Sequence, residues 1–549
     1  MKTKLPITGL LLAALAFGCS PAPVQIGLPT TLPLAESFPE SVPQPTEARF
    51  TPETPAVVDD DVSLWIAPEV PDALRGMADM LSTLEGVVLV EAEADAEVRL
   101  EAWGDSPLSV WVYAVVVPFP RTRDDISRTE IQSIWTSQSS TDRIYTSAST
   151  AAAMESVLGE PSSSQVQQQL GPVDPDAIWR SRNALAIVPF EELELRWKVL
   201  SVDDTSPLQR GFDPSQYPFI VVYGLSGPGD LVERIENVWD WPAINREPQK
   251  MTVLTMTGTT ALGRTTAARM AQFGIGYPAR DILPWLEEAD ILHISSEVSF
   301  ADDCPTPDPF VLDLRFCSAP ENIGLLELIG ADVIELTGNH NMDWGGEAFL
   351  YTLELYEARG WETYGGGATL EEAQQGVVLE HNGNRFLFLG CNRAGPASAW
   401  AGADSPGAAT CDYDVLIPQV AAARDAGIIP VFTFQWYENP TISYALREAA
   451  HTMLEAGAVI VSGSQAHQPL GFEFYGDGFV HYGLGNLFFD QMQAEELRRE
   501  FIDRYIVYDG RVISLELLTA MLEDYARPRP MITWERELLL RDMFEMSGW

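Results

Sequence analysis

Apolar residues recur along this chain with two alternating periods. Unbroken apolar runs such as Trp111–Val117 and Ala184–Val188 are typical of buried β-strands. Between such runs, residues 71–84 and 124–135 carry apolar positions at helical spacing. Strands that alternate with helices indicate an α/β architecture. We therefore predict a first, smaller α/β domain over residues 62–228.

The same alternation resumes after residues 229–249, which predict an amphipathic helix and a connector. A second, larger α/β domain is predicted over residues 250–520. Its predicted strands cover residues 252–256, 291–295, 333–336, 385–389, 429–434 and 459–461. Near the C-terminus, residues 505–508 and 511–518 predict two edge strands, and residues 521–549 predict a helical tail.

The first residues of the chain have the anatomy of a signal peptide. Lys2 and Lys4 precede a short apolar run, residues 10–17, which ends at Gly18 and Cys19. The run is too short to span a bilayer as a permanent helix. Residues 15–19 resemble the bacterial lipobox, which implies a lipoprotein signal peptide over residues 1–19 and lipidation of Cys19. The alternative is an ordinary cleaved signal with an incidental cysteine.

A proline-rich segment separates this signal from the first domain. Residues 20–60 contain nine prolines with scattered Ser, Thr and Glu and no periodic pattern. Such a composition favours an extended, semi-rigid tether. Together the two segments predict an extracytoplasmic protein that is anchored to the bacterial cell membrane through its N-terminal lipid.

The chain is strongly acidic, with 79 acidic and 34 basic residues and a formal net charge of −45. A field of this sign repels the phosphate backbone, so nucleic acid is excluded as a partner. The hydrophobic fraction of 46% is enough for sizeable cores. The acidity is typical of a soluble exported protein and does not by itself indicate a metal.

Four cysteines remain after Cys19, an even number that predicts two disulfides in an exported chain. Of the three possible connectivities, Cys304–Cys317 and Cys391–Cys411 close short local loops and are the ones we predict.

Two segments of the first domain carry a resemblance. Residues 114–120, followed by 125–127 and 134–136, and residues 186–192 resemble the phosphate-type periplasmic substrate-binding proteins. The resemblance covers about 165 residues, which is short for a two-lobed binding protein, and implies a compact relative. Whether this domain senses a small anion or is an α/β spacer stays open.

The most informative stretch lies in the second domain. Asn339 and His340 follow the predicted strand at residues 331–335, where a Gly-bearing loop begins. Imidazole nitrogen and amide oxygen both suit divalent metals such as Zn, Mn or Fe. Asp343 is placed to orient the imidazole. The alternative is a turn with a hydrogen-bonded histidine.

Six segments, in order, resemble the CapA family of capsule-synthesis proteins, whose fold is similar to the calcineurin-type metallophosphoesterases. They are Gly258–Arg264, Ser296–Glu297, Gly338–Gly345, Phe434–Glu438, Gly463–His467 and Tyr482–Asp490. The resemblance implies a layered αββα sandwich for the second domain. It also implies a role in making, anchoring or transporting an anionic surface polymer such as poly-gamma-glutamate.

The chain departs from the family pattern at likely metal ligands. Thr259, Gln435 and Gln465 stand where the family carries an aspartate and two histidines. A dinuclear phosphoesterase needs such Asp, His and Asn ligands to hold two cations. The remaining polar groups could hold one divalent metal (Mn, Zn or Fe), or none.

The resemblance assigns candidate roles to the groups that remain. Those expected to hold a metal or the substrate are Glu297, Asn339, His340 and His467. Glu438 is the candidate general base, Arg264 the candidate clamp for phosphate or carboxylate oxygens, and His340 a further catalytic candidate. Asp343, Gln435 and Gln465 are expected to support them, and His481 is a lesser candidate.

Each group also has a structural alternative. Glu297 and Glu438 could pair with Arg264, and the two histidines could hydrogen-bond across neighbouring loops. Retention of the carboxylates and histidines favours a hydrolase or an amide-processing enzyme, whereas loss of the ligands favours a non-catalytic polymer- or anion-binding protein. The expected partners are an anionic polymer or small anionic substrate, the cell membrane and capsule-assembly membrane proteins.

Overall fold

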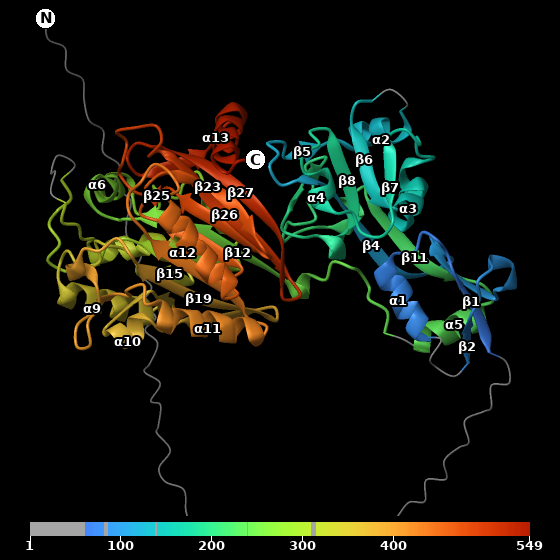
Figure 1. Cartoon of the computed structure of the whole chain (residues 1–549), viewed down its shortest axis with the longest axis horizontal. Coiled ribbons are helices and arrows are strands. Elements are labelled where there is room, and N and C mark those ends of the chain that lie inside the picture. Colours follow the sequence, from blue (N-terminus) through green and yellow to red (C-terminus); the bar gives the residue numbers. More distant parts are fainter. Residues whose placement is uncertain (1–60, 82–85, 138–139, 239, 309–313) are drawn as a thin grey trace, which may run out of the picture. The chain divides into compact units, whose positions relative to one another are not determined.

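The computed structural model describes residues 61–81, 86–137, 140–238, 240–308 and 314–549. The described residues belong to one unit, whose helices and strands are labelled in Figure 1. The division of this unit into two domains stays a prediction. The predicted signal peptide, Cys19 and the tether lie outside the described residues. In the described chain, no helix has both the length and the apolar character needed to cross a membrane.

Among the described residues up to 226, nine strands form one mixed sheet in the order β2-β1-β3-β11-β4-β8-β6-β7, with β9 paired to β4. They are β1 (Val62–Ile66), β2 (Val87–Leu89), β3 (Val98–Ala102), β4 (Ser106–Pro118), β6 (Arg143–Ser147), β7 (Val166–Gln169), β8 (Ala184–Pro189), β9 (Trp197–Val199) and β11 (Ile220–Ser226). The helices are α1 (Asp72–Leu81), α2 (Arg128–Thr136), α3 (Ala148–Leu158), α4 (Pro175–Ile178) and α5 (Gly229–Val238). The apolar runs predicted as strands lie in β4 and β8.

Helix α2 begins four residues later than its sequence pattern indicates. Asp125 and Ile126 instead form β5 (Asp125–Ile126), which pairs with β10 (Ser201–Val202). Ser127 then caps the helix, because its hydroxyl accepts a hydrogen bond from Glu130 N at 3.1 Å. The start of α2 therefore depends on β10, a strand more than 70 residues further along the chain.

Two large sheets and a two-stranded one, β17 (Gly366–Gly367) paired with β20 (Gly407–Ala408), lie beyond residue 250. In the described chain, the larger has the order β16-β15-β14-β12-β26-β27-β28, with β13 and β25 attached, and the smaller has the order β18-β19-β21-β22-β24-β23. The first contains β12 (Met251–Thr257), β13 (Thr259–Thr260), β14 (Ile291–Ser296), β15 (Val333–Glu335), β16 (Glu362–Tyr364), β25 (Asn486–Phe488), β26 (Arg499–Tyr508), β27 (Arg511–Glu523) and β28 (Arg527–Pro530). The second contains β18 (Val377–His381), β19 (Asn384–Asn392), β21 (Ile429–Gln435), β22 (Ile460–Ser464), β23 (Pro469–Tyr475) and β24 (Gly478–Leu484).

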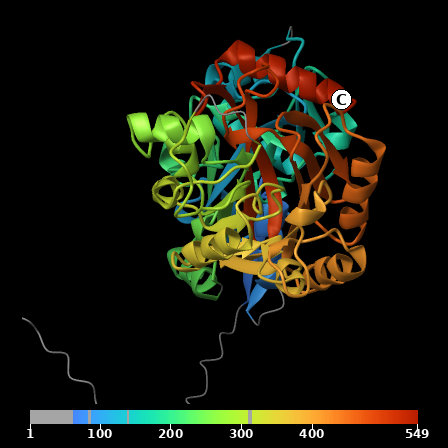
Figure 2. The ribbon, with the colours of Figure 1, turned by 90° about the vertical axis from the view of Figure 1, so that its left-hand side faces the viewer.

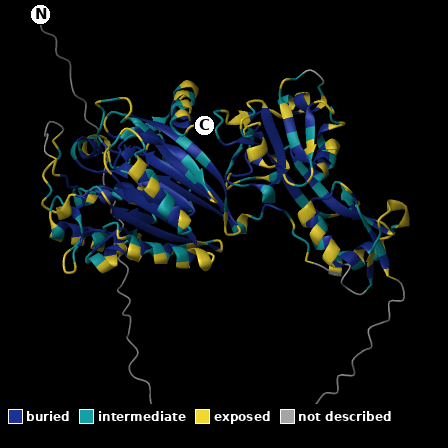
Figure 3. Cartoon of the chain, viewed as in Figure 1, coloured by how far each residue is buried: buried dark blue, intermediate teal, exposed yellow. Residues whose placement is uncertain are grey.

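Helices cover the outer faces of these two sheets. They are α6 (Arg264–Phe273), α7 (Leu283–Leu286), α8 (Gly324–Ile329), α9 (Gly346–Glu357), α10 (Leu370–Ala373), α11 (Tyr413–Asp425) and α12 (Tyr444–Glu455). Helix α13 (Thr533–Met546) instead contributes its buried residues to the core between the sheets. Leu254 and Val333 of one sheet share a core with Phe388 and Val431 of the other, so the sheets pack face to face. Separate outer cores join each sheet to its helices. Figure 2 shows the strands between these helices, and Figure 3 shows how completely the strands are buried.

The C-terminal segment is more central than its pattern indicates. The prediction that residues 505–508 and 511–518 form edge strands is wrong. Strand β26 lies between β12 and β27, and β28 pairs with the outer side of β27. Strand β27 also continues to Glu523, past the predicted boundary at residue 520. Helix α13 packs against β23 with its buried residues Leu540 and Met543.

Both predicted disulfides are present. Cys304 and Cys317 have their Cα atoms 5.8 Å apart, and Cys391 and Cys411 have theirs 5.0 Å apart.

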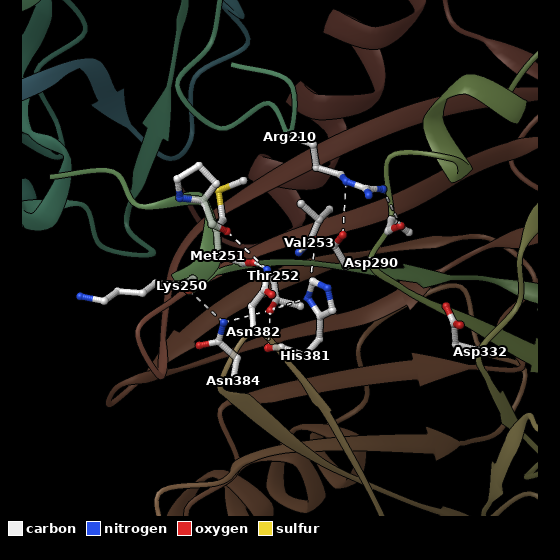
Figure 4. Close-up of polar contacts among 12 residues, drawn as sticks. Arg210, Lys250, Met251, Thr252, Val253, Asp290, Asp332, His381, Asn382 and Asn384 are labelled. Carbon is white, nitrogen blue, oxygen red and sulfur yellow. Dashed lines mark hydrogen bonds and ion pairs between the residues drawn. The ribbon is translucent and has the colours of Figure 1, made fainter. Parts of the chain in front are cut away.

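A polar cluster at the start of β12 joins the two sheets (Figure 4). Thr252 Oγ1 donates to the carbonyl oxygen of His381 at 2.9 Å, and Asn384 Nδ2 donates to Thr252 Oγ1 at 2.9 Å. Asp290 Oδ2 accepts the backbone N–H of Val253 at 2.9 Å. His381 is the last residue of β18 and supports the fold at the opposite end of the strands from the site described next.

Candidate functional site

The predicted site residues follow the carboxyl ends of parallel strands from both sheets. Strands β14 and β15 run parallel in one sheet, and β21 and β22 run parallel in the other. Glu297 follows β14, Asn339 and His340 follow β15, Gln435 ends β21, and the loop after β22 carries the last two residues of the set. Ligand sites in parallel α/β sheets form at this end, because the side chains that follow the strands converge there.

Gln435 joins the two sheets at the centre of the site. Its Nε2 donates to Asn339 Oδ1 at 3.1 Å, to Glu297 Oε2 at 3.4 Å and to Gln465 Oε1 in a closer contact. Its own oxygen accepts a hydrogen bond from the hydroxyl of Ser464. The side chain is fully buried, so these bonds satisfy an amide that would be costly to leave unpaired.

Glu297 is a buried carboxyl group beside Gln435. Its side chain has no solvent exposure, and its Oε1 has no hydrogen-bond partner among the described residues. Burial raises its pKa to about 7, against the opposing charge of His340. Gly338 allows this close approach, because a Cβ there would lie 2.8 Å from Glu297 Cα.

His340 is oriented by Asp343, as the spacing of the two residues suggests. Asp343 Oδ2 lies 2.6 Å from His340 Nδ1, which places the proton on Nδ1 and directs Nε2 away from the carboxylate. The His340 ring lies 4.2 Å from the ring of Phe316. Burial lowers the pKa of His340, but the bond to Asp343 and the charge of Glu297 outweigh it and raise the pKa above its ordinary value.

His467 is almost completely buried and is held by Asn486, whose Oδ1 lies 2.9 Å from His467 Nδ1. Burial lowers the pKa of His467, so the ring is neutral at neutral pH. Three residues of the site have left-handed backbones, namely Arg264 (φ 44°), Gln465 (φ 79°) and His467 (φ 53°). Non-glycine residues in this conformation are uncommon and gather at functional sites.

Arg264 does not pair with Glu297 or Glu438, so that alternative is wrong. Its guanidinium forms a short ion pair with Asp490, and Asp490 also accepts the backbone N–H of Thr265 at 3.1 Å. The guanidinium carbon lies 4.4 Å from the centre of the Phe316 ring. This pairing fixes the orientation of Arg264, whose charge still lowers the pKa of both His340 and His467.

Glu438 lies at the exposed rim of the site. Its Oε1 accepts a hydrogen bond from Gln465 Nε2 at 3.3 Å. The charge of Glu438 acts on the nearby His467. Of the two carboxyl groups, buried Glu297 has the pKa suited to proton exchange near neutral pH, although the sequence pattern pointed to Glu438 as the base.

Two buried histidines lie outside the candidate site. His481, the lesser candidate, lies in the core between the sheets with its Nδ1 2.6 Å from Asp503 Oδ2, and is not part of the site. His293 lies 3.5 Å from Glu335, beneath the site, and lowers the pKa of that carboxyl group against the effect of burial. The sequence analysis missed Glu335, because a single acidic residue in an apolar strand carries no motif.

Asn486 and Asp490 were also missed as site residues. Both lie in the Tyr482–Asp490 segment, whose resemblance to the family was the available signal.

The side chains present do not fit a metal centre of the metallophosphoesterase kind. Within the described ranges, no three Asp, Glu, His or Cys side chains are grouped so that they could hold a metal ion. The oxygens of Asn339 and Gln465 accept hydrogen bonds from the Gln435 amide. The hydroxyl of Thr259 is buried and has no partner in the described chain. We therefore derive no step through a metal.

Comparison with known sequences identifies the second half of the chain. Residues 253–491 match the family described as bacterial capsule synthesis protein PGA_cap. The capsule biosynthesis protein CapA of Bacillus anthracis is 28% identical over 307 residues, which cover 55% of this chain and 74% of that protein. The PGA biosynthesis protein CapA of Bacillus subtilis is 27% identical over 175 residues, which cover 31% of this chain and less than half (46%) of that protein.

Solved structures give more distant similarities. The NAD nucleotidase of Haemophilus influenzae is 8% identical, covers 54% of this chain and 56% of that chain, and has a TM-score of 0.31. An ABC-type phosphate transport receptor from Vibrio cholerae is 11% identical, covers 32% of this chain and 91% of that chain, and has a TM-score of 0.26. We base no inference on similarities of this size. The sequence matches and the six ordered segments point to the same family: residues 253–491 match the bacterial capsule synthesis protein PGA_cap family.

Proposed function

We propose that this protein binds an anionic, amide-bearing surface polymer during its synthesis or anchoring, at the site of Asn339, His340 and His467. The printed names of its relatives, capsule biosynthesis protein and PGA biosynthesis protein, support the polymer class. In this function the site holds polymer without a metal.

The observation that carries the proposal is the environment of the Gln435 amide. This side chain stands where the family pattern has a histidine, and it donates to the oxygens of Asn339 and Gln465. The pocket is thus built from amides, a buried carboxyl group and two histidines. Amides both donate and accept hydrogen bonds, which matches the donors and acceptors of an amide-linked chain.

Charge in the pocket suits an anionic ligand despite the acidity of the whole chain. The pKa of Glu297 is raised to about 7, so about half of these carboxyl groups are uncharged at pH 7. The raised pKa of His340 favours its cationic form. At physiological ionic strength charges are screened beyond about 8 Å, so these local groups outweigh the distant acidic surface.

A second candidate function is metal-independent chemistry on the same polymer, as an amide-processing enzyme or hydrolase. Glu297 supports it, because a carboxyl group with a pKa of about 7 exchanges protons readily near neutral pH. In this version Glu297 moves the proton, while His340 and Arg264 hold anionic oxygens of the substrate.

The remaining parts of the proposal concern fold type and location. The helix-sheet-sheet-helix layering supports a calcineurin-type metallophosphoesterase sandwich that has lost its metal ligands. We also propose lipid attachment at Cys19 to the bacterial cell membrane, where capsule-assembly membrane proteins are the partners. Mass spectrometry of the mature N-terminus tests the attachment, and a Cys19 without lipid overturns it.

The binding function is tested with the full chain by calorimetric titration of amide-linked glutamate oligomers. Asn339→Ala and His340→Ala are expected to weaken binding at least tenfold, since each removes a hydrogen bond to a charged ligand. Asn237→Ala is the matched control, because Asn237 is an exposed helical residue that bonds only to the carbonyl of Glu233. Failure of the wild-type chain to bind any oligomer overturns the proposal.

The same samples separate binding from catalysis. Release of free amines from the oligomer, abolished by Glu297→Gln, supports the enzymatic version. If the oligomer binds but no free amines are released after prolonged incubation at pH 6 to 8, the function is binding alone.

A further inference from the structure

An aromatic groove opens beside the candidate site, at the carboxyl end of β21. It has a volume of about 560 Å³. The residues that define it are Arg393, Tyr413, Trp436, Tyr437, Tyr444 and Glu448. A volume of this size is within the range of ligand-binding clefts.

The groove is continuous with the site through the backbone. Trp436 and Tyr437 are the two residues between Gln435 and Glu438, both of which belong to the site. Arg393 follows the end of β19, and its N–H donates to the carbonyl oxygen of Gln435 at 2.8 Å. The groove therefore adjoins the site along residues 435–438.

The walls of the groove are held by rigid elements. One wall is a single face of α12, which presents Tyr444, Ala445, Glu448, Ala449 and Thr452. The opposite wall includes Tyr413 at the start of α11, and the Cys391–Cys411 disulfide ties this segment to β19.

Two of the aromatic side chains in the groove are exposed to solvent. Tyr437 is 50% exposed and Tyr444 is 76% exposed, whereas Trp436 beneath them is 7% exposed. The rings of Trp436 and Tyr437 meet edge to face, with centroids 5.9 Å apart. Aromatic rings arranged in this way present flat apolar faces together with hydroxyl groups to a ligand.

Charged side chains also line the groove. Its charged residues are Arg393 and Glu448, and Glu448 is engaged by a hydrogen bond with Tyr444. The Arg393 side chain is exposed and has no ion pair within the part of the chain that the structure describes. An unpaired guanidinium on an otherwise acidic protein is suited to a carboxylate of the ligand.

We propose that this groove is a second binding subsite, which holds the continuation of an acidic, amide-linked chain whose reacting or anchored end lies at the Asn339/His340 site. The inference rests on the proposed function. Arg393 binds a carboxylate, the tyrosine rings pack against the planar amides, and their hydroxyls bond to amide groups. An acidic peptide-like chain is favoured over an acidic polysaccharide because the adjoining site is itself lined by amides.

The test compares ligands of two lengths on the full chain. A glutamate dimer occupies the site only, whereas an oligomer of roughly twelve residues, about 3.5 Å per residue when extended, spans site and groove. Arg393→Gln is expected to weaken binding of the long oligomer about tenfold and to leave dimer binding unchanged. The double variant Tyr437→Ala, Tyr444→Ala is also expected to weaken binding of the long oligomer and to leave dimer binding unchanged.

Arg385→Gln is the matched control. Arg385 is an exposed arginine at the other end of the same strand, β19, and pairs only weakly with Glu380 at 3.9 Å. Its substitution is expected to leave the affinity for both oligomers unchanged.

The outcomes separate this inference from the proposed function. No binding by the wild-type chain overturns both. Binding that is lost in Asn339→Ala but unchanged in Arg393→Gln overturns the groove alone. Polygalacturonate that binds as tightly as the glutamate oligomer, with the same sensitivity to Arg393→Gln, overturns the amide-linked ligand.

Discussion

Gln435 Nε2 lies 3.1 Å from Asn339 Oδ1, and this hydrogen bond connects the carboxyl end of β21 in one sheet with the loop after β15 in the other. A metal-binding pocket would direct both side chains toward a cation. Here they are directed toward each other, so the amides act as the bridge between the sheets. The stability of the sandwich and the shape of the site therefore depend on the same residue.

Removing this bridge is expected to destabilise the fold. Gln435→Ala leaves the half-buried oxygen of Asn339 and the buried oxygen of Gln465 without their donor, which costs about 2 kcal/mol in the free energy of unfolding. Urea denaturation measures this change. Gln375→Ala, at an exposed position after α10, is the control and should change the free energy by less than about 0.5 kcal/mol. An equal effect of the two substitutions would contradict the bridging role.

The pKa of Glu297 predicts how stability varies with pH. Its pKa is about 7 in the fold and near 4.5 when unfolded, so the native state binds more protons between these values. Stability contributed by this group is therefore present below pH 4.5 and is lost as the pH rises to about 7. Glu297→Gln removes this loss and should be more stable than wild type at pH 8, by on the order of 3 kcal/mol. The difference should vanish near pH 4, and unfolding titrations across this range check it.

Asp343 is expected to control the protonation of His340. Asp343→Asn removes the negative charge 2.6 Å from the imidazole, so the pKa of His340 should fall. Since the protonated ring favours an anionic ligand, oligomer binding should weaken at a lower pH in the variant than in the wild type. NMR titration of the His340 ring proton measures the pKa. A pKa that stays constant would disprove the contact.

Removal of metal ions is expected to leave the wild-type protein unchanged. Treatment with EDTA should alter neither the melting temperature nor oligomer binding, because the described residues lack a metal-binding group of three Asp, Glu, His or Cys side chains. Restoring the family ligands in the triple variant Thr259→Asp, Gln435→His and Gln465→His should create stoichiometric Mn²⁺ binding, which metal analysis detects. A loss of oligomer binding by EDTA-treated wild type would show that the native site uses a metal.

The Cys391–Cys411 disulfide is expected to stabilise both the fold and the aromatic groove. It closes a loop with a sequence separation of 20, for which chain entropy gives about 3 kcal/mol. Replacing both cysteines by alanine should lower the free energy of unfolding by this amount, with a larger effect on long-oligomer than on dimer binding. Replacement of Cys304 and Cys317 is the comparison, since that pair lies outside the groove lining.

Much of the architecture follows from local patterns. The buried strands β4, β8, β14 and β21 have apolar runs along their length, because both faces of each strand contact a core. The late start of α2 and the interior position of β26 did not follow from such patterns. Each depends on pairing with a strand that is remote in sequence, β10 for the segment before α2 and β12 for β26.

The sequence was sufficient to place Glu297, Asn339, Gln435 and Gln465 at the ends of strands. Parallel strands bring their carboxyl ends to the same edge of a sheet, so these residues were expected to lie near one another. The sequence could not assign their partners. The pairing of Arg264 with Asp490 joins residues 226 positions apart, and the burial that raises the pKa of Glu297 exists only when both sheets have packed. Hydrogen-bond partners and burial are properties of the packed chain, and they distinguish a pocket of paired amides from a metal centre.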